Sequence, residues 1–380
     1  MGVTFLKRII SFMCAVLLFA AASGSAEAVS TGASSAILMD ADSGRILYEQ
    51  NIHDRRPIAS ITKLMTALVA VERTEDLEKS VVIQPEWTGI EGSSIYLRPN
   101  EEVTVKELLY GLLLQSGNDA AEAIAGYVAG GTAAFAELMN QRAAELGMEN
   151  SHFTNPSGLN DEGHYSTAYD MALLARACLA NHIVAEICAS QQATVGGRTF
   201  HNHNKLLHRY EGCVGMKTGY TELAGRTLVS AAVRNGQTLI CVTLNDGNDW
   251  SDHEKLFDYG FETYPLRVLC TQGTIFGGVK VTESLIPSLQ VVAAESPSYP
   301  LRDGEVPKLT IELVKKMAAP VDAQTPVGKA TWTLDGTVIA ETALVCAGAA
   351  EKHAYEGHRL WERFFSRAKI TIARNGAHLI

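Results

Sequence analysis

Positive charge is scarce in this sequence. Its 380 residues include 32 lysines and arginines against 42 aspartates and glutamates, which gives a formal net charge of −10. Phosphate binding needs a concentrated basic surface, and the body of the chain has none, so a nucleic-acid partner is excluded. The composition, 47% hydrophobic and 19% charged residues, is ordinary for a globular chain long enough for two domains.

Metal-binding spacings and a disulfide framework are also lacking. The cysteines form no C-x-x-C pair, and no His-rich spacing suggests zinc. The six cysteines that follow Cys14 are widely scattered in a chain large enough to bury a core without cross-links. We expect neither a metal nor a cofactor, and buried free thiols at six positions: Cys178, Cys188, Cys213, Cys241, Cys270 and Cys346.

The apolar run at the N-terminus is too short for a typical membrane span. Lys7 and Arg8 precede an apolar stretch over 9–22, whereas a span needs roughly 20 residues. Small residues follow, with an A-x-A pattern at 26–28. These features predict a secretory signal peptide over residues 1–28 that is cleaved after Ala28. An uncleaved anchor is the alternative.

Strand and helix patterns follow one another in a fixed order. Apolar runs at 35–39 and 45–48, separated by turn residues, predict a β-hairpin. Helical spacing begins at Ser60, and Thr104 with Glu107 forms a capping box for a second helix. Few apolar residues, Pro156 and two glycines predict a long surface loop over 151–165. Further helices are expected over 120–129, 135–146, 168–179 and 251–261.

Strand character returns in the second half of the chain. Asn235-Gly236 lies between apolar runs at 228–233 and 238–244, which is the strongest short-range hairpin signal. We therefore predict an α/β (α+β) fold in which both ends of residues 29–265 form an antiparallel sheet around a helical insert. Short β-like segments and an Asp335-Gly336 turn predict a small all-β domain over 266–350.

The last segment, residues 351–380, has an amphipathic pattern. Leu360, Trp361, Phe364 and Phe365 are spaced to share one helical face beside four basic residues. This pattern suits adsorption of residues 357–373 to an anionic membrane surface, while the charges exclude a span. A frayed tail, or a helix packed on the β-domain, is the alternative.

Three short motifs carry the chemistry. Ser60 and Lys63 are three residues apart, so both project from one side of a first helical turn, where free backbone N–H groups can stabilise an oxyanion. A lysine can activate a serine only if burial or another cation depresses its pKa. Ser116-Gly117-Asn118 lies in a turn between helices, and Lys217-Thr218-Gly219 precedes the predicted hairpin on an edge strand.

Each motif alone is weak, but the set S-x-x-K, S-x-N and K-T-G in this order is the signature of penicillin-binding proteins and class A β-lactamases. Residues 59–66, 116–120 and 216–221 closely resemble the serine D-alanyl-D-alanine carboxypeptidases. Residues 165–172 and the small β-domain resemble the same family, so the similarity spans nearly the whole mature chain.

The resemblance implies a role for each residue. Ser60 would attack the carbonyl between two D-alanines of a peptidoglycan stem peptide, Lys63 would take its proton, and the N–H groups of Ser60 and Tyr220 would hold the oxyanion. Ser116 would pass a proton to the leaving D-alanine, and Asn118 would bind the substrate backbone. The terminal carboxylate would lie on Lys217 and Thr218, with Gly219 allowing close approach. β-Lactam antibiotics would acylate Ser60, and the protein would act outside the cytoplasm, at the bacterial cell membrane or wall.

One departure from the family and three alternatives follow from the same residues. Some relatives carry a histidine before Gly158-Leu159, whereas this chain has Ser157, which puts the order of this loop and any part of that histidine in deacylation in doubt. A β-lactamase is disfavoured because 151–165 has no E-x-x-L-N and β-lactamases lack the extra domain. A D,D-endopeptidase shares the chemistry and stays open. The intact Ser60, Lys63 and Lys217 disfavour an inactive peptidoglycan-binding protein.

Overall fold

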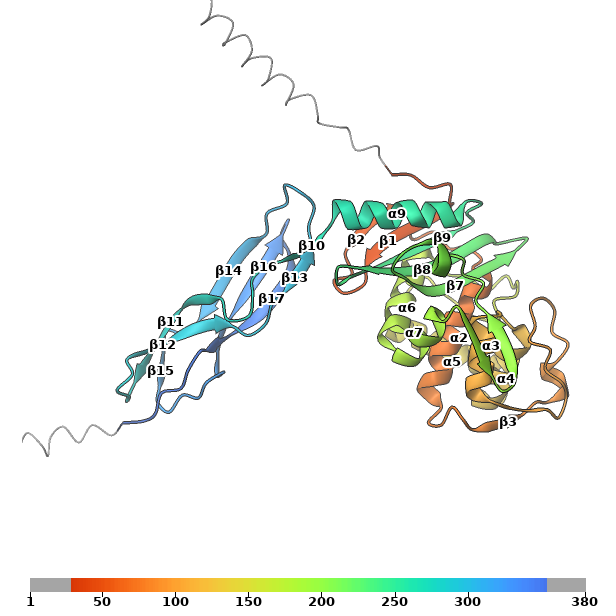
Figure 1. The fold of residues 1–380 in the computed structure, drawn as a ribbon, viewed down its shortest axis with the longest axis horizontal. Helices are drawn as coiled ribbons and strands as arrows, with labels where there is room; N and C mark the ends of the chain where they lie inside the picture. Colours follow the sequence, from red (N-terminus) through yellow and green to blue (C-terminus); the bar gives the residue numbers. More distant parts are fainter. Residues whose placement is uncertain (1–28, 354–380) are drawn as a thin grey trace, which may run out of the picture.

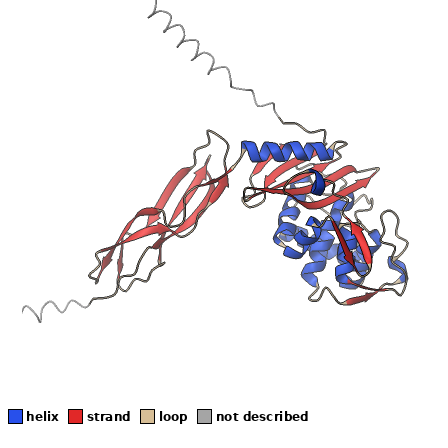
Figure 2. Cartoon of the chain, viewed as in Figure 1, coloured by secondary structure: helices blue, strands red, loops and turns tan. Residues whose placement is uncertain are grey.

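A computed structural model describes residues 29–353 of the chain. The predicted signal peptide over 1–28 and the predicted amphipathic segment over 357–373 lie outside the described residues. The described chain forms a mixed helical and β-sheet domain, followed by a domain built from strands (Figures 1 and 2).

The first domain is organised around a five-stranded antiparallel sheet with the order β2-β1-β9-β8-β7. Its first two strands come from the start of the domain and its last three from the end, so the helices between them form an insert, as predicted. Asn235 and Gly236 join β8 to β9 with φ of 52° and 79°, the left-handed pair that a tight two-residue hairpin requires. The strands are β1 (Ser35–Asp40), β2 (Ile46–Gln50), β7 (Cys213–Thr221), β8 (Gly225–Arg234) and β9 (Gln237–Leu244).

Helices cover both faces of this sheet (Figure 1). α9 packs on one face through a cluster that includes Leu228, Leu239 and Phe257. The helical insert packs on the other face and holds the largest core cluster. The longer helices are α2 (Lys63–Arg73), α3 (Val105–Leu113), α4 (Asn118–Ala129), α5 (Thr132–Glu145), α6 (Ala168–Ala180), α7 (His182–Ala189) and α9 (Asp249–Thr263).

Small elements connect the helices. Two short hairpins and three single turns of helix lie between the longer elements, and the hairpins do not join the main sheet. The sequence patterns did not predict α7 or either of these hairpins. The small elements are η1 (Ala59–Thr62), β3 (Ser80–Val82), η2 (Pro85–Trp87), β4 (Glu102–Thr104), β5 (Gln192–Val195), β6 (Arg198–His201) and α8 (Leu206–Arg209).

Two predictions about local structure were wrong. The helix at Ser60 opens with a 3₁₀ turn, η1, and the α-helix itself begins only at Lys63. Ala59, just before Ser60, has a left-handed φ of 50°, which a regular helix does not include. The segment 151–165 is not a surface loop throughout, since Phe153, Ser157 and His164 are buried. The prediction that Thr104 caps a helix is confirmed, because Thr104 Oγ1 accepts a hydrogen bond from the Glu107 N–H at 3.1 Å.

The second domain is a six-stranded sheet with the order β14-β16-β17-β12-β11-β15 and a two-stranded sheet of β10 and β13. Its core contains Val279, Val291, Trp332 and Leu344. The predicted Asp335-Gly336 turn joins β16 to β17, so the all-β prediction is confirmed. The strands are β10 (Leu266–Val268), β11 (Ile275–Thr282), β12 (Ser288–Ala293), β13 (Ser298–Pro300), β14 (Lys308–Leu313), β15 (Lys316–Ala318), β16 (Pro326–Leu334) and β17 (Thr337–Cys346).

Arg45 joins the two domains. Its guanidinium donates two hydrogen bonds to the Glu305 carboxylate, at 2.5 and 2.9 Å, and one to the Pro300 carbonyl at 2.6 Å. The planar, bidentate geometry and the rings of Tyr264 and Tyr299 beneath the cation fix its orientation.

Two further findings concern thiols and hydropathy. The six cysteines after Cys14 are free thiols; four are buried, and Cys213 and Cys270 are half-buried.

Within residues 29–353 no single helix has both the length and the apolar character to cross a membrane. Only α6 and α7 taken together do, and they meet at an angle of 101°.

Candidate active site

The Ser60 turn lies against the edge strand β7. The Thr227 hydroxyl on β8 donates a hydrogen bond to the Ile58 carbonyl at 2.9 Å, which holds the turn on the sheet. A Cβ on Gly219 would lie 2.4 Å from Thr227 Oγ1 and 2.9 Å from the Ser60 nitrogen. Only glycine therefore lets β7 approach the backbone N–H groups of the turn so closely.

Lys63 is the centre of a buried polar cluster. Its Nζ lies 2.9 Å from Ser60 Oγ, 2.6 Å from Asn118 Oδ1 and 2.6 Å from the Ser157 carbonyl oxygen, and no part of the residue is exposed. Burial lowers the pKa of the Lys63 amine well below its usual 10.5, and the Lys217 cation lowers it further. The neutral amine that a proton acceptor requires is thus favoured.

The turn between α3 and α4 presents the second motif. Ser116 has a left-handed φ of 63° and lines the cleft, while Asn118 opens α4 and reaches Lys63. Asn118 also forms hydrogen bonds with the segment around residues 91–93. Its N–H donates to the Ser93 carbonyl at 2.7 Å, and its Nδ2 donates to the Glu91 carbonyl at 2.5 Å. Among the described residues, Lys63 Nζ forms a hydrogen bond with Asn118 and none with Ser116.

Asp119 fixes the same segment more firmly. Its carboxylate accepts hydrogen bonds from the backbone N–H groups of Ile95 and Leu97 and from the Ser94 hydroxyl at 2.6 Å. The sequence analysis did not single out Asp119. An acidic residue in the first turn of a helix was the available signal, because such a carboxylate is placed to accept nearby N–H groups.

The third motif contributes the wall of the cleft. Thr218, Gly219 and Tyr220 line a cleft of about 350 Å³ together with Ser60 and Ser116. Lys217 lies beneath this wall: it is 1% exposed, and its Nζ donates to the Thr218 carbonyl at 2.9 Å. Burial lowers the pKa of Lys217 to about 8.

The loop before α6 covers the other side of the Ser60 turn. Asn155 Oδ1 accepts from the N–H groups of Ser157 and Gly158, at 3.2 and 2.8 Å. Gly158 has a φ of +83°, and a Cβ there would lie 2.0 Å from the Ala59 carbonyl oxygen. The loop is therefore packed directly on Ala59, the residue before the serine, and Ser157 stands in it where some relatives carry a histidine.

His164, which the sequence analysis did not identify, links this loop to the same turn. Its Nδ1 accepts from the Thr154 N–H at 3.2 Å, so its protonated Nε2 donates to Thr62 Oγ1 at 2.8 Å. The Thr62 hydroxyl in turn donates to the Ala59 carbonyl at 2.8 Å. Burial lowers the pKa of His164 to about 4, which keeps the ring neutral.

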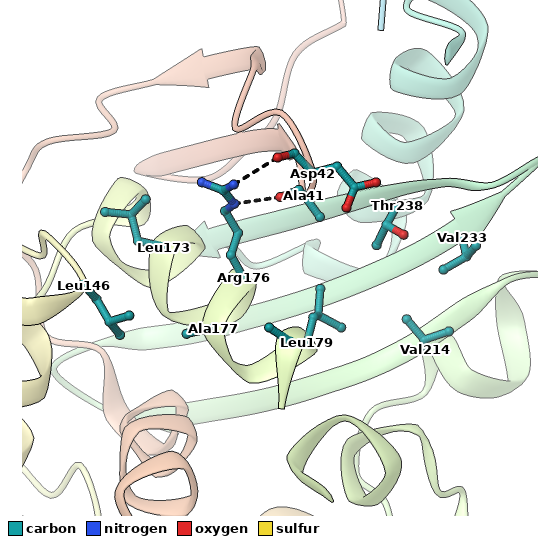
Figure 3. A pocket seen from close by; sticks show the side chains of 11 residues that line it. Ala41, Asp42, Leu146, Leu173, Arg176, Ala177, Leu179, Val214, Val233 and Thr238 are labelled. Atoms are coloured by element: carbon teal, nitrogen blue, oxygen red, sulfur yellow. Dashed lines mark hydrogen bonds between the residues drawn. The ribbon is translucent and has the colours of Figure 1, made fainter. Parts of the chain in front are cut away.

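A larger pocket, about 590 Å³, lies away from these motifs beside α6 (Figure 3). The Arg176 guanidinium there donates to the carbonyls of Ala41 and Asp42, at 2.7 and 3.1 Å. Of the described residues that line it, none is a serine, cysteine, lysine or histidine. It has no paired nucleophile and base, so we place the active site at the smaller cleft of Ser60.

Comparison with known proteins agrees with this geometry. A family profile described as D-alanyl-D-alanine carboxypeptidase matches residues 22–248. The chain belongs to the D-alanyl-D-alanine carboxypeptidase family. A second profile, the C-terminal domain of penicillin-binding protein 5, matches residues 264–352 of this family member. The resemblance seen in the motifs and the fold class are therefore confirmed.

Individual relatives of the family match over most of the chain. D-alanyl-D-alanine carboxypeptidase DacF of Bacillus subtilis is 32% identical over 82% of this chain and 84% of its own length. DacC of Escherichia coli is 33% identical over 90% of each chain.

Solved structures of the family extend the match to the fold. A peptidoglycan synthesis regulatory factor (PBP3) of Streptococcus pneumoniae is 28% identical and has a TM-score of 0.76 over 85% of this chain and 100% of that one. Penicillin-binding protein 5 of Haemophilus influenzae is 29% identical, with a TM-score of 0.69 over 85% of this chain and 98% of that one.

Proposed function

We propose that this protein is a serine-type carboxypeptidase that removes the terminal D-alanine from peptidoglycan pentapeptide stems. The observation that carries this proposal is the 2.9 Å contact between Ser60 Oγ and the Nζ of the fully buried Lys63, at the floor of an open cleft. A hydroxyl becomes a good nucleophile when a neighbouring neutral amine accepts its proton.

The first half-reaction forms an acyl-enzyme. Ser60 Oγ attacks the carbonyl carbon of the penultimate D-alanine, and its proton passes to Lys63 Nζ. The N–H groups of Ser60 and Tyr220 hold the negative oxygen of the tetrahedral intermediate. When the C–N bond breaks, the Ser116 hydroxyl gives its proton to the departing amine and takes up the proton held by Lys63 Nζ, and D-alanine leaves.

Substrate recognition uses the other members of the site. Asn118 bonds to the substrate backbone, and the terminal carboxylate lies over Thr218 and the buried positive charge of Lys217. The close approach at Gly219 brings the substrate strand alongside β7. Water then hydrolyses the ester and regenerates Ser60. A β-lactam would acylate the same oxygen and leave a long-lived ester.

The test uses the chain from residue 29 to its C-terminus, without the predicted signal peptide. Incubation with a pentapeptide ending in D-Ala-D-Ala should release free D-alanine with multiple turnovers. A cross-linked peptide dimer and benzylpenicillin serve as parallel substrates. Faster cleavage of the dimer would identify an endopeptidase, rapid penicillin turnover would identify a β-lactamase, and no release would indicate an inactive binding protein.

Export and membrane adsorption belong to the same proposal. The stem peptide lies outside the cytoplasm, which fits a signal peptide over 1–28, a catalytic domain over 29–265 and a β-domain over 266–350. The basic, apolar pattern of 357–373 supports adsorption of the tail to an anionic membrane surface. Deleting the residues after Glu356 should lower the share of the protein in the membrane fraction; an unchanged share would overturn this part.

A further inference from the structure

The end of the C-terminal domain farther from the catalytic domain brings three segments together (Figure 1). We call residues 280–287, 315–319 and 350–353 the distal tip. The His353 N–H donates to the Glu283 carbonyl at 2.8 Å, and Lys352 Nζ lies 2.8 Å from the Glu283 carboxylate. The Ala319 N–H donates to the Thr282 carbonyl at 2.9 Å. The point where the described chain ends is thus attached to the loop between β11 and β12.

This loop exposes aliphatic side chains. Leu285 is 67% exposed and Ile286 42% exposed, and Pro287 beside them is also exposed. On the adjoining strand, by contrast, Val279 and Val281 are buried in the domain core. Leu285 and Ile286 therefore contribute little to that core, yet they keep apolar surface in water, which is unfavourable unless another surface covers it.

Lysines surround the same loop. Lys280 on β11 and Lys316 on β15 are paired residues of neighbouring parallel strands, and both are exposed. Like charges opposite each other destabilise a sheet, and no carboxylate within residues 29–353 forms an ion pair with either of them. Glu283, in the same loop, is paired with Lys352 instead. An anionic surface would relieve the repulsion between the two lysines.

We propose that the distal tip is a second membrane-docking site. Leu285 and Ile286 enter the boundary between lipid headgroups and acyl chains, while Lys280 and Lys316 contact lipid phosphates. The inference extends the proposed adsorption of the tail and rests on it. Residues 354–380 continue from the tip, and the basic and aromatic residues among them suit the same lipid surface. This continuity selects a lipid over a protein partner.

Docking at the tip has a consequence for the catalytic domain. The tip and the catalytic domain lie at opposite ends of the described molecule (Figure 1). Contact at two points, the loop and the tail, restricts tilting more than one flexible tether does.

Tryptophan depth measurements test contact at the tip in the full-length protein. Leu285→Trp is compared with Val306→Trp, because Val306 is 83% exposed and follows Glu305 at the end of the domain near Arg45. On vesicles of phosphatidylglycerol and phosphatidylcholine carrying brominated acyl chains, L285W should be quenched more than V306W. Both variants retain the same native tryptophans, so the difference reports the tip alone.

Vesicle flotation supplies the second measurement. Leu285→Ser with Ile286→Ser should lower binding by roughly tenfold or more, whereas Val306→Ser should leave it unchanged. Lys280→Gln with Lys316→Gln should lower binding to anionic vesicles and not to phosphatidylcholine alone. Wild-type flotation with equal quenching of the two tryptophans would overturn docking of the tip while the tail proposal stood. Absence of flotation would overturn both.

Discussion

Two buried polar clusters lie on opposite faces of the five-stranded sheet, and in each of them burial lowers the pKa of an ionisable group. In one, Lys63 contacts Ser60 and Asn118 under the open cleft. In the other, the His253 ring lies between the hydroxyls of Ser230 and Thr243, at 2.5 and 3.0 Å. Burial lowers the pKa of His253 to about 3.

The difference between the clusters lies in access and in a second charge. Ser60 lines a cleft, and Lys217 adds a cation that acts on Lys63. Ser230, Thr243 and His253 are completely buried, and they connect α9 to β8 and β9. A depressed pKa is therefore common to both clusters, and only the one whose serine lines a cleft can reach a substrate.

The largest predicted difference between the two clusters comes from replacing the serine of each with alanine. Ser60→Ala should abolish penicillin labelling and lower D-alanine release by more than about a thousandfold, because no acyl-enzyme can form. Lys63→Ala should do nearly the same. Ser230→Ala should leave D-alanine release within about twofold while lowering stability in urea by about 1 kcal/mol. If S230A folded normally but lost D-alanine release, the His253 cluster would not be purely structural, and the proposed difference between the clusters would be wrong.

A methyl group on β7 should have the next largest effect. Gly219→Ala would place a Cβ 2.4 Å from Thr227 Oγ1 and 2.9 Å from the Ser60 nitrogen, which forces the strand off the turn. We expect a fall of roughly a hundredfold in the rate of penicillin acylation, since small displacements at a reacting centre are costly. Gly247→Ala is the control, because its Cβ would meet nothing within 4 Å. Equal rates in the two variants would contradict the close approach.

The pH profile separates the two lysines. Lys63 must be neutral to accept a proton, so kcat/KM should fall at acid pH as it becomes protonated. Lys217 must be charged, and its pKa of about 8 should produce an alkaline limb near that pH. Lys217→Arg keeps a charge at all these pH values, so it should shift the alkaline limb upward and lower the maximum. An alkaline limb that stays in place in K217R would assign it to another group.

A smaller effect is expected from the hydroxyl that joins His164 to the Ser60 turn. Thr62→Val removes the bonds to both His164 and the Ala59 carbonyl without changing side-chain shape. The rate of acylation should fall about tenfold, because Ala59 is no longer held in its left-handed conformation. Thr62→Ser retains the hydroxyl and should restore most of the rate. If T62S were as slow as T62V, packing and not the hydrogen bonds would explain the effect.

Replacing His253, on the α9 face of the sheet, should change the pH dependence of stability and not catalysis. Its folded pKa of about 3 lies below the usual 6.5, so the unfolded chain binds more protons between these values and stability falls as pH is lowered. His253→Gln should reduce the stability lost between pH 6.5 and pH 4 by up to about 3 kcal/mol in urea titrations, with kcat unchanged. An identical acid dependence in H253Q would show that His253 does not titrate as proposed.

Much of this molecule follows from local sequence patterns. The capping box at Thr104, the hairpin turn at Asn235-Gly236 and the three motifs all depend on residues close in the chain, and all lie where the sequence placed them. By contrast, the left-handed Ala59 beside Ser60 packs against Gly158, about a hundred residues away, and the α-helix begins only at Lys63. No local pattern carries that contact.

The supporting residues of the site were harder to predict for the same reason. His164 and Asn155 act through a loop whose low apolar content indicated exposure, whereas its backbone packs on the Ser60 turn. Asp119 orders residues 94–97, which come earlier in the chain and carry no periodic signal. Chemistry-bearing residues were visible in the sequence, and the residues that position them required the fold.

The central claim is that Ser60, activated by Lys63, becomes covalently acylated. Mass spectrometry of the protein quenched during reaction with benzylpenicillin, followed by peptide mapping, tests it most directly. We expect one adduct on the peptide that contains Ser60, with no adduct in Ser60→Ala and only slow formation in Lys63→Ala. An adduct on Ser116, or D-alanine release from the pentapeptide by Ser60→Ala, would contradict it.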